Sequence, residues 1–102
     1  MGCEAMFRSS TSVRTQNGGR YLKRLCKHWS HKFDVTYTDE EGRVPFGDDR
    51  FCTFKASPES LAIEIEAPDQ EAIARLEQVV TDHLIRMADR DQLSELSWSR
   101  SF

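Results

Sequence analysis

Residues 61–90, LAIEIEAPDQEAIARLEQVVTDHLIRMADR, contain the two periodicities on which the fold prediction rests. Within residues 61–67, apolar and polar side chains alternate, which is typical of a strand with one buried face. After Pro68 the apolar residues recur every three or four positions, which predicts an amphipathic helix that continues to about Arg90. Proline is favoured at the start of a helix, and acidic residues in the first turn interact favourably with the helix dipole. We therefore expect a strand followed directly by a helix.

The remaining segments extend this pair to a complete α+β domain. We predict a weak strand over residues 5–15, a helix from Asn17 to about Lys32, and strands over 33–38, 43–46, 50–56 and 93–98. The order is β-α-β-β-β-β-α-β. Strands joined by tight turns are antiparallel, so we predict one antiparallel meander sheet with both helices on one face, in a single domain over residues 1–102. Pro45 indicates an edge or an irregular strand position. Helix-grip and ferredoxin-like variants fit the same order.

The composition is that of an ordinary globular protein, with 38% hydrophobic and 30% charged residues in 102. No apolar run approaches the roughly 20 residues that span a bilayer. Three cysteines without an export signal favour free thiols in a reducing cytoplasm, so we expect a cytoplasmic protein. Cys26 and Cys52 lie among apolar neighbours and are expected in the core.

Charge is distributed unevenly along the chain. Residues 5–33 carry seven basic side chains and no acidic one, whereas the rest of the chain carries seven basic and seventeen acidic residues. The net charge of −3 therefore conceals one strongly basic segment.

Within that segment, the stretch RYLKRLCKHWSHKF (residues 20–33) has the composition of a cysteine–histidine metal motif. A helix advances about 100° per residue, which places Leu22, Leu25 and Trp29 on one core-facing stripe. By the same rule Cys26 lies roughly 140–160° from both His28 and His31. The three side chains cannot bind one ion while the segment is helical, so Cys26 is assigned to the core.

Two histidines remain as candidate metal ligands in this stretch. His28 and His31 are three residues apart and therefore neighbours on the helix surface. The third candidate is His83, on the shoulder of the apolar stripe of the second predicted helix, which approaches His28 if the helices pack side by side. This hypothesis predicts a zinc or iron site formed by His28, His31 and His83. Alternatively, His83 is a partly buried imidazole hydrogen-bonded to a backbone group or a carboxylate.

The outward face of the first helix suggests a second kind of site. It carries Arg20, Lys23, Arg24, Lys27, His28 and His31, without a local carboxylate. Such a face is suited to an anion: a phosphate or carboxylate ligand, a nucleic-acid backbone or an acidic partner. The alternative is a solvated face whose counter-charges come from acidic residues 39–41 or 48–49. The acidic total charge and the lack of a nucleic-acid-binding motif argue against nucleic acid.

The sequence does not support an enzymatic activity. Cys26 is on the core-facing side, and Cys52 has no histidine near it in the sequence. The serines lack the G-x-S-x-G frame, and Gly18-Gly19 is too short to indicate a phosphate-binding loop. No residue is predicted to be catalytic.

Two segments, RYLKRLCKHWSHKF and LEQVVTDHLIRMADRDQLSELSW, resemble the bacterial family called domain of unknown function 2218, over about residues 12–98. The first fits the family pattern at Arg20, Tyr21, Leu22, Leu25, Cys26, Lys27, His28, His31, Lys32 and Phe33. The second fits at His83, Leu84, Arg86 and Trp98, and departs from it at Met87 and Asp91.

This resemblance implies a biological context and no established activity. Similar domains occur fused or adjacent to siderophore-interacting, flavin-dependent ferric reductases. The implied partners are a ferric siderophore or a redox partner protein. We therefore predict a bacterial, cytoplasmic binding or accessory module that uses the basic face of its first helix. A metal-binding protein is the alternative, and a purely structural or oligomerising protein is a third option.

Overall fold

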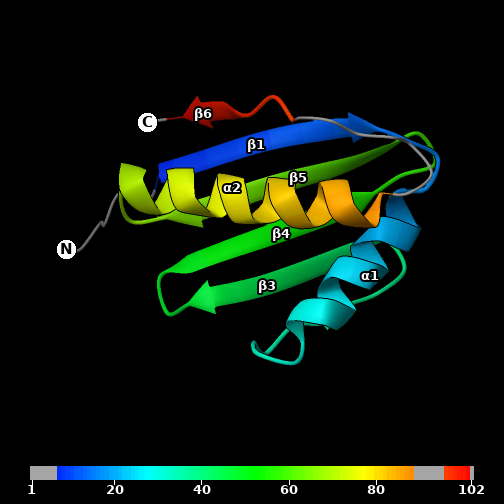
Figure 1. Ribbon diagram of the computed structural model, residues 1–102, viewed down its shortest axis with the longest axis horizontal. Helices are drawn as coiled ribbons and strands as arrows, with labels where there is room; N and C mark the ends of the chain where they lie inside the picture. The colour runs from blue at the N-terminus through cyan, green and yellow to red at the C-terminus, as the bar shows by residue number, and fades with distance from the viewer. Residues whose placement is uncertain (1–6, 89–95, 102) are drawn as a thin grey trace.

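The predicted succession of strands and helices is present in the computed structural model, which describes residues 7–88 and 96–101. The elements are β1 (Phe7–Arg14), α1 (Gly18–Trp29), β2 (Thr36–Tyr37), β3 (Glu41–Gly47), β4 (Arg50–Ala56), β5 (Ser60–Ala67), α2 (Gln70–Met87) and β6 (Ser99–Ser101). Figure 1 shows both helices on the same face of one sheet. The α+β prediction is confirmed.

All strand pairs in the sheet are antiparallel, in the order β2-β3-β4-β5-β1-β6. The strands from β2 to β5 form the predicted meander, since each pairs with the next along the chain. The first strand, β1, then pairs with β5, and β6 pairs with the opposite edge of β1 (Figure 1). The N-terminal strand is therefore an interior strand.

The hydrophobic core fills the space between the sheet and the two helices. The inward residues of β5 are buried as their alternation predicts. The predicted core stripe of α1 is buried together with Cys26 and with Tyr21, which the helical wheel did not place there. The buried residues of α2 are Ala72, Ile73, Leu76, Glu77, Val80 and Leu84. The core-facing assignment of α1 is therefore correct.

Two strand predictions have the wrong boundaries. Of the strand predicted over 33–38, only Thr36–Tyr37 pairs with β3, because Phe33 and Val35 pack against the core from the segment that follows α1. Tyr37 is 41% exposed, so the apolar alternation there does not mark a buried strand face.

The last strand lies further along the chain than the predicted 93–98. It is β6, at 99–101, and the half-buried Leu96 and Trp98 contact the core just before it. Residues 93–95 lie outside the described residues.

Helix boundaries and the proline in β3 follow from local chemistry. α2 begins at Gln70, two residues after Pro68, because the Asp69 side chain accepts a hydrogen bond from the Ala72 backbone N–H at 2.8 Å. Its predicted end at Arg90 lies outside the described residues, and the described helix ends at Met87.

α1 ends at Trp29, three residues before the predicted Lys32. The β3–β4 register shifts next to Pro45, which confirms its irregular position.

The position of α1 is set by glycines that let it approach the sheet closely. A Cβ atom added to Gly42 in β3 would lie 2.6 Å from the Sγ atom of Cys26. A Cβ atom on Gly18 would lie 2.9 Å from the carbonyl oxygen of Ser60. Real Cβ atoms do not make contacts this short, so both positions are restricted to glycine unless the helix shifts.

Replacing Gly42 by alanine tests this contact. Because the new methyl group overlaps Cys26, we expect the free energy of unfolding in urea to fall by about 1–3 kcal/mol. Gly47→Ala on the same strand is the control, since its Cβ would meet only the flexible Arg50 side chain, at 3.2 Å. We expect that control to change stability by less than about 0.5 kcal/mol.

A second background isolates the sulfur atom. A Cys26→Ala protein has no Sγ atom for the new methyl group to overlap. Gly42→Ala should therefore lower the free energy of unfolding by less in that protein than in the wild-type chain. An equal cost in both backgrounds would show that another contact fixes α1.

Candidate functional site

The basic face of α1 is open to solvent. Its six predicted site residues, Arg20, Lys23, Arg24, Lys27, His28 and His31, are all exposed. The first turn of α1 contains no acidic residue, so nothing in that turn offsets the positive end of the helix dipole.

A groove of about 650 Å³ lies beside the first two turns of α1. It is lined by Gln16, Asn17, Gly19, Arg20, Lys23, Arg24 and Asp39. Three of these side chains are cationic, and Asp39 is the one carboxylate among the described lining residues. The groove thus joins the first half of the predicted basic face, whereas Lys27, His28 and His31 lie outside it.

Two of the groove's cations have identified protein partners. The Nζ atom of Lys23 lies 3.3 Å from a carboxylate oxygen of Asp39, and both side chains are largely exposed. Such exposed pairs contribute little to stability and exchange readily with other ions. The guanidinium of Arg24 donates a hydrogen bond of 3.1 Å to the backbone carbonyl of Met87, the last residue of α2. Arg24 therefore also links the two helices, at the negative end of the α2 dipole.

The two helices bring His28 and His83 together, as the sequence predicted for helices packed side by side. Their ring centroids are 5.2 Å apart, and the His83 ring is also 5.2 Å from the ring of Trp29. The Nδ1 atom of His83 lies 2.7 Å from the carbonyl oxygen of Val79, which confirms the predicted backbone hydrogen bond. Among the described residues, no three His, Cys, Asp or Glu side chains are grouped to hold a metal ion. The three-histidine site stays a prediction.

Cys26 and Cys52 are both buried free thiols, as predicted. Burial raises the pKa of Cys26 to about 11 and raises the pKa of Cys52 well above its ordinary value. In the absence of a bound metal ion, burial therefore favours the protonated thiol at both positions.

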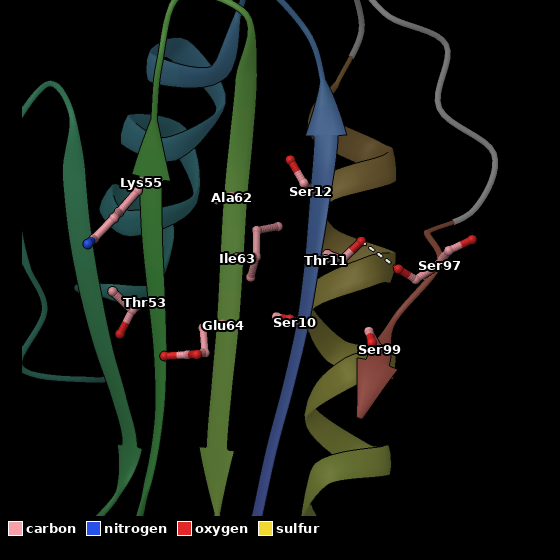
Figure 2. A pocket seen from close by; sticks show the side chains of 10 residues that line it. All are labelled: Ser10, Thr11, Ser12, Thr53, Lys55, Ala62, Ile63, Glu64, Ser97 and Ser99. Carbon is pink, nitrogen blue, oxygen red and sulfur yellow. Dashed lines mark hydrogen bonds between the residues drawn. The ribbon is translucent and has the colours of Figure 1, made fainter. Parts of the chain in front are cut away.

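A second concave surface, on the sheet face opposite the helices, was not predicted from the sequence. This trough has a volume of about 570 Å³. Figure 2 shows it over β4, β5 and β1, bordered by the segment that leads into β6. It is lined by Ser10, Thr11, Ser12, Thr53, Lys55, Ala62, Ile63, Glu64, Ser97 and Ser99. Its depth comes from the small side chains that the β1–β5 register places side by side, such as Ser12 opposite Ala62. The sequence gives no signal for that pairing.

A polar cluster centred on the buried Glu77 joins α2 to two strands. Glu77 accepts hydrogen bonds of 2.9 and 2.7 Å from the guanidinium of Arg100 in β6 and one of 2.6 Å from the hydroxyl of Ser9 in β1. The bonds from Arg100, with a smaller contribution from Ser9, hold the pKa of Glu77 below its ordinary value. The cluster satisfies its own polar groups and attaches the last strand to the core, so we assign it a structural role.

The family model described as "uncharacterized protein conserved in bacteria (DUF2218)" matches residues 10–99. The chain belongs to this family. The NMR structure of PA4090 from Pseudomonas aeruginosa is similar, with 44% sequence identity, a TM-score of 0.76, and coverage of 91% of this chain and 95% of that chain. The comparison with curated proteins finds no match. Neither described helix is long and apolar enough to cross a membrane.

The DUF2218 match includes the lining residues of the groove, the histidine pair and the lining residues of the trough. Of the two departures from the family pattern, Met87 contributes its backbone carbonyl to Arg24, an interaction that does not depend on the Met87 side chain. Asp91 lies outside the described residues.

Removing the charge of Glu77 tests the polar cluster around it. We expect Glu77→Gln to lower the free energy of unfolding at pH 7 by about 1–3 kcal/mol, because Arg100 and Ser9 lose an ionised acceptor. Glu64→Gln, at an exposed position in β5, is the control and should change stability by less than about 0.5 kcal/mol.

The pH dependence gives a second readout. Because folding lowers the pKa of Glu77, its contribution is present above about pH 4.5 and is lost as the pH falls through the folded-state pKa. The stability difference between wild type and Glu77→Gln should therefore shrink in acid. A difference independent of pH would contradict the proposed charge interaction.

Proposed function

We propose that this protein is a non-enzymatic binding module in which the basic face of α1 contacts an anionic ligand or an acidic partner. The groove beside the first two turns of the helix carries this proposal. It combines three cationic side chains with the positive end of the α1 dipole. The remaining basic face, with Lys27, His28 and His31, extends the same positive surface along the helix.

The charge balance of the groove favours an anion. Arg20, Lys23 and Arg24 are present in the lining against the single carboxylate of Asp39. Each unit charge at about 4 Å from an anionic group contributes about 1 kcal/mol even in bulk water. Arg24 keeps its positive charge while it donates to the Met87 carbonyl, so that bond leaves the positive field of the groove in place.

The size of the groove supports a small ligand ahead of a large surface. A volume of about 650 Å³ lies within the range of roughly 300–1,000 Å³ that is typical of small-molecule sites. The exposed carboxylate of Asp39 pairs with Lys23, so it would compete with an anionic ligand for that ammonium group. A ligand carboxylate or phosphate would replace that carboxylate as the partner of Lys23.

The iron context implied by the family resemblance supplies specific candidates for the anion. A ferric siderophore with catecholate or carboxylate groups carries the required negative charge, and an acidic redox partner protein is the macromolecular alternative. We would test the siderophore and a simple polyanion, which stands for the acidic partner, in the same titration series. The series then identifies both the chemical class of the ligand and the residues that bind it.

Charge reversal in the groove tests the proposal. We titrate the full chain with a ferric siderophore, with inorganic phosphate and with polyglutamate, and follow backbone amide shifts by NMR. Shifts at residues 16–24 are expected for the true ligand class, and Arg20→Glu/Lys23→Glu should weaken its binding by at least about tenfold, which corresponds to 1.4 kcal/mol. If none of the three anions shifts these residues, the proposal fails.

A charge-matched double variant controls for net charge, and a single variant tests the competing carboxylate. Lys55→Glu/Arg75→Glu makes the same change of −4 on the open sheet face and on α2, and should leave affinity within about twofold because the charges lie outside the groove. Asp39→Asn removes the competing carboxylate and should raise affinity. If Lys55→Glu/Arg75→Glu weakened anion binding as much as Arg20→Glu/Lys23→Glu does, the total charge of the protein, and not the groove, would govern binding.

A further inference from the structure

Two imidazoles from different helices meet where α1 passes α2. The His28 and His83 ring centroids are 5.2 Å apart, with 47° between the ring planes. With metal–nitrogen bonds of about 2.0–2.1 Å, two imidazoles bound to one ion have ring centres roughly 4.5–5.5 Å apart. The observed separation lies in that range.

The hydrogen bond of His83 leaves the correct nitrogen available. A backbone carbonyl can only accept, so the 2.7 Å contact with Val79 places the proton of the neutral ring on Nδ1. The Nε2 atom then keeps its lone pair. A carbonyl or carboxylate partner on the second ring nitrogen is the usual arrangement for a histidine that binds a metal, because it fixes both the tautomer and the ring orientation.

The surroundings hold the two rings in place. Trp29, which is only 4% exposed, contacts both rings, with centroids 6.3 Å from His28 and 5.2 Å from His83. The Arg24 to Met87 hydrogen bond joins the middle of α1 to the last residue of α2. The rings are therefore supported by a buried aromatic residue and a fixed helix pair, so little ordering is needed before an ion binds.

We infer that His28 and His83 form a two-histidine binding site for a first-row divalent transition metal ion, distinct from the groove. His28 is exposed and His83 half-buried, so water or an external anion can complete the coordination. Imidazole nitrogens suit Cu(II), Ni(II) and Zn(II), whereas Ca(II) and Mg(II) require oxygen ligands. The inferred site differs from the predicted three-histidine site because it does not include His31.

Titration of the full, tag-free chain with metal alone tests this inference. The protein carries Cys3→Ser, because Cys3 lies outside the described residues and its thiol would compete for the ion. Calorimetry with Zn(II) and Cu(II) in a non-coordinating buffer should give one ion per chain. NMR should show the largest Zn(II) shifts at the imidazoles of His28 and His83, and Cu(II) spectra should show coupling to two nitrogens.

Single-residue variants identify the ligands. His28→Ala and His83→Ala should each weaken metal binding by about 100-fold or more, since even changes to residues behind a ligand cost roughly 10–100-fold. His31→Ala is the matched control and should leave affinity unchanged. Because His28 is exposed, its removal is expected to leave the fold intact, which the amide spectrum verifies.

Three results would overturn the inference. They are the absence of Zn(II) and Cu(II) binding to the Cys3→Ser chain, unchanged affinity in His28→Ala, and an equal loss in His31→Ala. None of them bears on anion binding, because no anionic ligand is present and the groove residues are unchanged.

Discussion

The close contact between α1 and β3, where Cys26 lies over Gly42, fixes the geometry of both candidate sites. It sets how far the helix stands from the sheet, and Gly18 sets the same distance at the start of the helix. With α1 held there, its outward cations border the groove and its last turn reaches α2. A larger residue at either glycine would lift the helix and move both surfaces together.

The two candidate sites share one helix but depend on different physical interactions. The groove depends on charge that is solvent-exposed, so its binding strength should vary with ionic strength. The inferred histidine site depends on the placement of the two rings, which the buried Trp29 contacts. The Arg24–Met87 hydrogen bond connects them, because it belongs to the groove lining and also holds the helices side by side. A ligand that drew Arg24 away would loosen the support behind the histidines.

Much of this arrangement could be predicted from local sequence. Periodicity identified both helices, their buried stripes and the order of the elements, and the helical wheel separated Cys26 from the histidines. The strands at 36–37 and 99–101 were misplaced, because partly buried side chains such as Phe33 and Trp98 contact the core without pairing. The trough and the Glu77 cluster were missed. Both are created by the pairing of β1 with β5 and β6. These strands are far apart in the chain, so no local sequence pattern indicates which of their residues pair.

That same interior position of β1 has a consequence for how the chain folds. Arg14 pairs with Ser60 and Phe7 with Ala67, so the strands that meet in the middle of the sheet are 46 and 60 residues apart in the chain. The meander of β2 to β5 needs only short loops, and its entropic cost of closure is small. Contacts between distant segments slow folding, so β1 should join after the meander has formed. The groove borders the β1–α1 connection at Gln16 and Asn17, and would be completed in that late step.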